Sequence, residues 1–303
     1  MPSSQESHAR DREPLNQKIA HQITLLIGED HDRSTLLHDL KIFRRTESSL
    51  ACPCLYEPSL ILVVQGQKKM LLNKQEFIYD PHHFLLTSLD IPASTQVLEA
   101  HPDKPCLGLS LHLDRKIITD LGSHLSIPSN VLPEKSAATS ETHLKILDAI
   151  FRLLELLQEP ESISFMAPLI LKEIYYRLLK SDVAPLLWNI AASGSTGHRV
   201  AHAIQWLKRH YAQPILMTEL AQNVQMSPSS LHHHFRQLTG KSPLQYQKWL
   251  RLNEARRLMI NHHLDAATAS YQTGYESPSH FSRDYKKLFG LPPKQDMKRQ
   301  SSC

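Results

Sequence analysis

The feature that most constrains this chain is an internal repeat in its last third. The segment SPSSLHHHFRQLTGKSP begins at Ser227, and SPSHFSRDYKKLFGLPP begins at Ser277, an offset of 50 residues. The serine-proline start, two apolar positions, a leucine, a glycine and a final proline recur at matching places. A match of this length is improbable by chance, so we expect two copies of one structural unit.

Each copy has the pattern of a short helix with defined ends. Serine is a good N-cap, proline fits the first helical position, and glycine ends the helix. A shorter helix is expected just before each copy, over 218–224 and 266–273, and the second pair is joined by a turn containing Gly274. Two short helices joined by a tight turn are typical of helix-turn-helix units, which we expect at about 219–240 and 266–289.

A longer helix is predicted between the two units, starting at Ser242 and Pro243. About 20 residues at ~1.5 Å each make it roughly 30 Å long, close to the ~34 Å turn of B-DNA. Two recognition helices could therefore enter successive major grooves on one face of DNA. Its apolar stripe is Trp249, Leu252, Ala255, Leu258 and Met259, with Arg251, Arg256 and Arg257 on other faces.

The net charge of +4 hides an asymmetry. Residues 1–195 carry 19 Lys and Arg against 24 Asp and Glu, whereas residues 196–303 carry 15 against 6. A basic module next to an acidic remainder suggests a nucleic-acid-binding domain joined to a second domain, although a well-solvated surface would also be basic. The acidic part could also weaken DNA binding until a signal repositions it.

The first two thirds of the chain have a different pattern. Residues 1–13 are polar and are expected to be disordered, followed by a helix with apolar residues from Leu15 to Leu26. Short apolar runs broken by turn formers over about 42–113 predict a small β-sandwich or barrel. Helices are expected at about 141–180, and AASGSTG at 191–197 is typical of a linker. The fold class is therefore α+β with two domains.

Residues 197–298, and above all ATASYQTGYESPSHFSRDYKKLFGLPP, closely resemble the DNA-binding domain of AraC/XylS-type bacterial transcription regulators. Residues 15 to about 185 resemble the AraC-type N-terminal domain through LYEPSLILVVQGQKKMLL and YDPHHFLLTSLDIPASTQVLEA. The resemblance implies a cupin-like β-sandwich with following helices over 14–190 and a double helix-turn-helix domain over 198–298. Where the family often has Val-Gly-Phe this chain has Thr273-Gly274-Tyr275, Ser270 replaces a favoured alanine, and Tyr285 stands at a usual phenylalanine.

Helical geometry indicates which side chains face DNA. If Leu231, Phe235 and Leu238 face the core, other positions of the first recognition helix project outward. The resemblance implies that outward residues near each helix start read base edges; Arg283 is the best candidate for a bidentate guanine contact, and residues nearer the helix ends suit phosphates. The candidate DNA-binding residues are Ser229, His232, His233, Arg236, Ser279, His280, Ser282, Arg283, Lys286 and Lys287.

Histidines and cysteines suggest other sites. The run His232-His233-His234 is a poor metal site because adjacent helical residues diverge by about 100°, so DNA contacts are favoured and binding should strengthen as pH falls from about 7.5 to 6. The pair His82-His83 lacks metal-ligand spacing. Cys52 and Cys54 have one residue between them, so they are expected to be ordinary thiols, with a redox or electrophile sensor as the alternative. No metal or cofactor is expected.

Two classes of function remain. The leading hypothesis is a DNA-binding transcriptional regulator whose N-terminal domain binds a small-molecule effector or a partner subunit. The alternative is a cupin-type enzyme with an accessory helical domain, but nucleophile and G-x-G-x-x-G or P-loop motifs are missing. Expected partners are double-stranded promoter DNA, RNA polymerase, an effector and a second copy in a homodimer. Polar first residues and short apolar runs predict a cytoplasmic protein without membrane contact.

Overall fold

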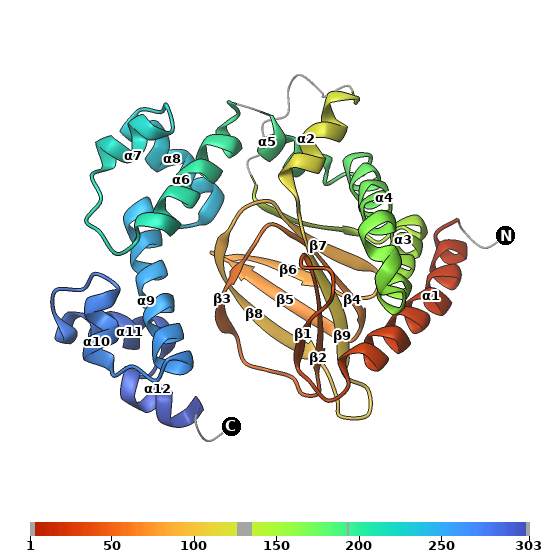
Figure 1. Ribbon diagram of the computed structural model, residues 1–303, viewed down its shortest axis with the longest axis horizontal. Coiled ribbons are helices and arrows are strands. Elements are labelled where there is room, and N and C mark those ends of the chain that lie inside the picture. Colours follow the sequence, from red (N-terminus) through yellow and green to blue (C-terminus); the bar gives the residue numbers. More distant parts are fainter. Residues whose placement is uncertain (1–3, 126–134, 193, 301–303) are drawn as a thin grey trace. The chain divides into compact units, whose positions relative to one another are not determined.

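The structure, a computed structural model, describes residues 4–125, 135–192 and 194–300. The chain divides into two compact units, with the division between His198 and Arg199. The first unit holds two β-sheets with flanking helices, and the described part of the second is built of helices (Figure 1). The expected α+β fold, with a β-sandwich domain before an all-α domain, is confirmed.

Both sheets of the first unit are antiparallel. The six-stranded sheet runs in the order β1 (Asp32–Ser34), β2 (Leu40–Arg45), β9 (Cys106–His112), β4 (Ser59–Gln65), β7 (His83–Thr87) and β10 (Ala137–Glu141). The four-stranded sheet runs in the order β3 (Cys52–Tyr56), β8 (Ile91–Glu99), β5 (Gln67–Leu72) and β6 (Gln75–Tyr79).

The sandwich extends beyond the expected range of about 42–113. Strand β1 and the start of β2 precede it, and β10 follows it. Strand β10 has the sequence AATSE, and β1 is fully exposed, so neither shows the alternation of large apolar residues that marks a strand in a sequence. Pairing with β7 places Ser140 opposite Phe84 and holds β10 at the sheet edge.

Helices cover the sandwich. Figure 1 shows α1 beside α3, and α3 beside α4, at one flank of the sheets. Helix α1 packs there through Ile19, Ile23 and Ile27, which are all buried. None of the described helices is long and apolar enough to cross a membrane. The helices of this unit are α1 (Ser4–Ile27), α2 (Arg115–Ser123), α3 (Leu144–Glu155), the 3-10 turn η1 (Leu156–Gln158), α4 (Pro160–Leu179) and α5 (Ala184–Ala191).

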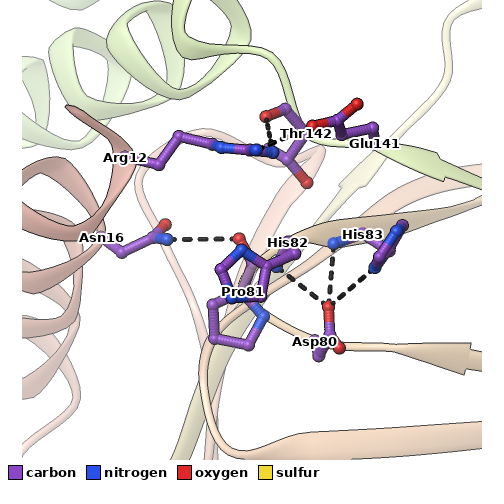
Figure 2. A network of polar contacts seen from close by, with 8 residues as sticks. All are labelled: Arg12, Asn16, Asp80, Pro81, His82, His83, Glu141 and Thr142. Atoms are coloured by element: carbon purple, nitrogen blue, oxygen red, sulfur yellow. Dashed lines mark hydrogen bonds and ion pairs between the residues drawn. The ribbon is translucent and has the colours of Figure 1, made fainter. Parts of the chain in front are cut away.

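The expectation of disorder over residues 1–13 is wrong for the described part, because α1 begins at Ser4 and continues through Pro14. Two polar residues anchor this end of the helix (Figure 2). The buried Arg12 guanidinium donates to the Thr142 carbonyl at 3.2 Å and to the Glu141 carboxylate at 2.7 Å. The buried Asn16 amide donates to the Pro81 carbonyl at 3.2 Å. These partners are far away in sequence, so local composition gives no sign of them.

The second unit is a series of short helices around one longer helix. It contains α6 (Thr196–His210), α7 (Met217–Asn223), α8 (Pro228–Thr239), α9 (Pro243–Asn261), α10 (Ala266–Gln272), α11 (Pro278–Phe289) and α12 (Pro293–Gln300). Helix α6 begins at Thr196, so it takes up the end of the segment that we expected to be a linker over 191–197. The first turn of α6, up to His198, still belongs to the first unit, where the Asn189 side-chain oxygen accepts from the Gly197 amide at 3.1 Å.

Candidate nucleic-acid interface

The first candidate recognition helix, α8, has the ends that its sequence predicts. The Ser227 side chain caps it by accepting from the Ser230 amide at 3.2 Å, and Gly240 ends it at a φ of 76°. Leu231, Phe235 and Leu238 are buried, as we expected. The four candidate contact residues of α8 are all exposed, namely Ser229, His232, His233 and Arg236.

Helix α11 repeats this arrangement. Ser277 caps it, Gly290 ends it at a φ of 82°, and Phe281 and Tyr285 are buried. Of the six candidate residues, five are exposed and Ser282 is half-buried; the exposed ones are Ser279, His280, Arg283, Lys286 and Lys287. Three pairs of candidate residues are therefore exposed at equivalent positions of the two helices: Ser229 and Ser279, His233 and Arg283, and Arg236 and Lys286.

The basic side chains of this unit fall into two sets. Four basic residues of the recognition helices are exposed: Arg236, Arg283, Lys286 and Lys287. Within residues 194–300, the first three pair with no carboxylate. An exposed cation of this kind can pair with a phosphate without breaking an internal ion pair. By contrast, the basic residues of α9 make internal contacts: Lys248 pairs with Asp284 at 3.0 Å, Arg256 with Asp296 at 2.8 Å and Arg257 with Glu254 at 2.8 Å.

Arg251 has a role that the sequence did not reveal. From α9, its guanidinium donates to the carbonyls of Tyr211 at 2.6 Å, Gln213 at 3.0 Å and Gly274 at 2.8 Å. The first two carbonyls belong to the loop between α6 and α7, and the third belongs to the turn of the second helix-turn-helix. Gln247 adds bonds to the same loop, at 2.9 Å to Tyr211 and 2.6 Å to Gln213. One residue of the connecting helix therefore joins the loop that leads into the first helix-turn-helix unit to the turn of the second unit.

The residues that depart from the family pattern carry hydroxyl groups, and these hydroxyls all have hydrogen-bond partners. The Thr273 hydroxyl donates to the Ala269 carbonyl at 2.9 Å, and the Ser270 hydroxyl donates to Ala267 at 2.7 Å. The Tyr285 hydroxyl donates to Asp296 at 2.7 Å, which also binds Arg256. Burial and this carboxylate raise the pKa of Tyr285 well above its ordinary value, so the phenol stays protonated. These departures are accommodated without orphaned hydroxyls.

The first unit holds a pocket between its two sheets. Its volume is about 240 Å³, and strands of both sheets line it. The hydroxyls of Tyr56 and Tyr79, both in its lining, are hydrogen-bonded to each other at 3.1 Å. The lining residues are Lys41, Phe43, Cys54, Leu55, Tyr56, Glu57, Ser59, Ile61, Lys68, Tyr79, Thr95 and Ser110.

The thiols of this unit are free cysteines. Cys52 is exposed, whereas Cys54 faces the pocket and Cys106 is buried. Burial raises the pKa of Cys54 to about 12 and that of Cys106 to about 11, so both stay protonated near neutral pH.

The remaining histidines that we singled out lie in two different settings. His234 is half-buried, and its ring meets that of His233 edge-on, with 5.0 Å between centroids. His82 and His83 lie in the turn between β6 and β7, where both amides donate to the Asp80 carboxylate at 2.9 Å (Figure 2). These bonds lower the pKa of Asp80. Among the described residues, no group of three or more side chains is placed to hold a metal ion.

The fold and this surface together define a class: a double helix-turn-helix protein carrying a β-sandwich domain. The model of the AraC-type transcriptional regulator N-terminus matches residues 36–186, and a helix-turn-helix domain model matches residues 220–299. The chain belongs to the AraC family of transcriptional regulators.

Three individual proteins illustrate the relationship. The transcriptional activator RhaS of Escherichia fergusonii is 25% identical, over 86% of this chain and 96% of that protein. The regulator CdhR of Pseudomonas aeruginosa is 33% identical, but the match spans only 34% of this chain and 31% of CdhR. Among solved structures, ToxT of Vibrio cholerae O395 has the same fold, with a TM-score of 0.55, 12% identity, and coverage of 88% of this chain and 97% of ToxT.

Proposed function

We propose that this regulator binds promoter DNA by placing α8 and α11 in successive major grooves, with the exposed candidate residues of each helix reading bases or contacting phosphates. The repeated exposure pattern on the two helices carries this proposal. Helix α9 between them has 19 residues, which at ~1.5 Å each span about 28 Å, near one turn of B-DNA.

Arg283 is the residue on which base recognition is most sharply tested. It is exposed and without an internal ion pair in the described unit, and a bidentate contact of arginine with guanine contributes roughly 1–3 kcal/mol of discrimination. We expect Arg283→Met to lower affinity for a site selected from random DNA by about tenfold to a hundredfold. The loss should concentrate at one base pair, measured by anisotropy against a set of single-base variants of that site.

The matched control is Arg257→Met. Arg257 is also exposed, but it lies on α9 and pairs with Glu254 in the same helix. It should leave the affinity and the base preference unchanged. If Arg283→Met lowers affinity equally for every sequence, the residue contacts phosphate and the assignment of base recognition is wrong.

We further propose that a small molecule bound at the β-sandwich pocket controls DNA binding. ToxT, whose fold this chain shares, has been solved with an unsaturated fatty acid bound, which supports a small-molecule effector here. A ligand changes DNA affinity only if it binds two states of the regulator unequally. The test is a titration of the selected DNA site with and without small organic molecules that fit the pocket, and a ligand that binds the pocket should shift the DNA affinity.

The other partners stay predictions. Contact with RNA polymerase, assembly as a homodimer and a cytoplasmic location are further proposals, made from the resemblance to the family. The relatives above are transcription regulators, which favours a non-enzymatic role over the cupin-type enzyme. Turnover of a ligand bound in the sandwich pocket would contradict that choice.

A further inference from the structure

The sandwich pocket contains an inward-facing lysine, Lys68, that forms no ion pair with a carboxylate among the described residues. Lys68 lies on the inward side of β5, the same side as the buried Met70 and Leu72. Its ammonium nitrogen lies 4.2 Å from the centre of the Phe43 ring. Across the described residues of this unit, no carboxylate pairs with it. Burial lowers the pKa of Lys68, as expected for an ammonium group withdrawn from water.

The next residue shows the ordinary arrangement. Lys69 points to the other side of the same strand, where it pairs with Glu76 at 2.9 Å. The two adjacent lysines of β5 therefore differ in their surroundings. The outward Lys69 pairs with a carboxylate, whereas the inward Lys68 lines the pocket. This makes Lys69 a natural control for Lys68.

The neighbouring groups do not neutralise Lys68. Arg45 also adds positive charge nearby, but both oxygens of Asp32 bind it, at 2.8 and 2.9 Å. The thiols of Cys54 and Cys106 stay protonated because their pKa values are raised. Lys41 and Glu57 are exposed residues of opposite charge in the pocket lining. The interior of the pocket is thus positive, and an anion would restore the balance.

The pocket offers a further donor. The hydroxyls of Tyr56 and Tyr79 carry two hydrogens, and their mutual bond uses one of them. The other can donate to an acceptor. Burial raises the pKa of both phenols, so both stay protonated. Phe43 and Ile61 supply apolar surface in the same lining.

We propose that the effector is a small organic carboxylate, and that its carboxylate pairs with Lys68 inside the β-sandwich while its apolar part contacts Phe43 and Ile61. A pocket of about 240 Å³ lies below the usual range for drug-sized ligands, roughly 300–1,000 Å³, so the ligand is a small metabolite. This inference rests on the proposed effector control of the regulator.

The test compares acids with their neutral amides. Benzoate and hexanoate are titrated into the full-length protein by calorimetry, alongside benzamide and hexanamide, which keep the shape and lose the charge. A charge-assisted pair predicts that at least one acid binds about tenfold or more tightly than its amide. Equal affinity of both acids and their amides, or no binding of either acid up to about 10 mM, overturns the inference.

Variants locate the charge. Lys68→Met should reduce acid binding to the level of the amide, whereas Lys69→Met should leave acid binding unchanged. Lys68→Arg keeps the charge and should keep the preference for acid over amide, which separates loss of charge from loss of folding. If Lys68→Met prefers the acid as strongly as the unaltered protein does, another group binds the carboxylate and the assignment is wrong.

DNA binding of the same protein sample separates this inference from the proposed function. Promoter binding without acid binding overturns only the carboxylate assignment. Acid binding without sequence-specific DNA binding overturns the proposed function and leaves the assignment of Lys68 standing.

Discussion

Gly274 lies directly against the carbonyl of Ala212. A Cβ atom added at Gly274 would lie 2.0 Å from that carbonyl oxygen, and the φ of Gly274 is +84°. Gly274 belongs to the turn between α10 and α11, and Ala212 to the loop after α6. The second helix-turn-helix unit therefore contacts the loop that leads into the first, with no room for any side chain between them.

Replacing Gly274 by alanine should destabilise this unit. A left-handed conformation costs a residue with a Cβ roughly 1–2 kcal/mol, and the clash adds to that cost. The control is Gly290→Ala, since Gly290 has a φ of +82° but nothing within 4 Å of an added Cβ. Urea unfolding should show a larger loss of stability for Gly274→Ala than for Gly290→Ala. Equal losses would mean that the loop moves aside and the contact is not tight.

Arg251 should control how the two recognition helices are spaced. Its three carbonyl bonds join the loop after α6 to the turn holding Gly274. We expect Arg251→Met to weaken binding to the selected site by about tenfold, the effect of losing roughly 1.4 kcal/mol. It should also weaken the preference for that site over one with a base pair inserted between its halves.

Lys248→Met provides the comparison for Arg251, since Lys248 lies on the same helix and joins α9 only to Asp284 of α11. The spacing preference of this variant should match that of the unaltered protein. An Arg251→Met variant that loses affinity but discriminates the two spacings as before would show a purely structural role for the arginine.

The sequence predicted the second unit better than the first because its signals are local. N-cap serines, helix-ending glycines and the stripe of Leu231, Phe235 and Leu238 all act within a few residues, and each of them occurs in both copies of the repeat or has a counterpart there. The role of Arg251 could not be predicted because its acceptors are backbone carbonyls 23 to 40 positions away. Every residue has a backbone carbonyl, so the sequence does not single out these acceptors.

In the first unit, the sequence does not show which distant strands pair or in which register. The alternation around Lys68 and Lys69 marks a strand, but only the sheet register decides which lysine points inward. The same holds for Arg12, whose partners are 129 and 130 positions away. A polar segment with such partners is predicted to be disordered when its neighbours alone are considered.

The two closely spaced cysteines should differ sharply in reactivity. With a pKa of about 12, the fraction of Cys54 present as thiolate at pH 8 is about one in ten thousand, and it rises tenfold with each further pH unit. Cys52 is exposed. Brief iodoacetamide treatment at pH 8 followed by peptide mass spectrometry should therefore modify Cys52 and spare Cys54. Rapid modification of Cys54 would support the sensor hypothesis, as would loss of induction in the Cys52→Ser, Cys54→Ser double variant.

The lysines at the end of α11 should set the salt dependence of DNA binding. Lys286 and Lys287 are exposed and lie in the last turn of the helix. Removing one phosphate-binding cation lowers the slope of log affinity against log salt by about 0.9. Lys286→Met should thus reduce this slope by about one and weaken binding to all DNA sequences alike. Lys294→Met, an exposed lysine of α12, is the control, and a slope equal to that of the unaltered protein in Lys286→Met would rule out the phosphate contact.

The exposed histidines of α8 should make DNA binding depend on pH. Imidazole gains a proton as pH falls toward 6, and a cation next to the DNA backbone adds attraction, so binding is strengthened at pH 6 and weakened at about 7.5. The double variant His232→Gln, His233→Gln should lose most of this dependence. His262→Gln, an exposed histidine at the end of α9, should retain it. Anisotropy titrations at fixed salt measure both, and a flat pH profile in the unaltered protein would remove these two histidines from the interface.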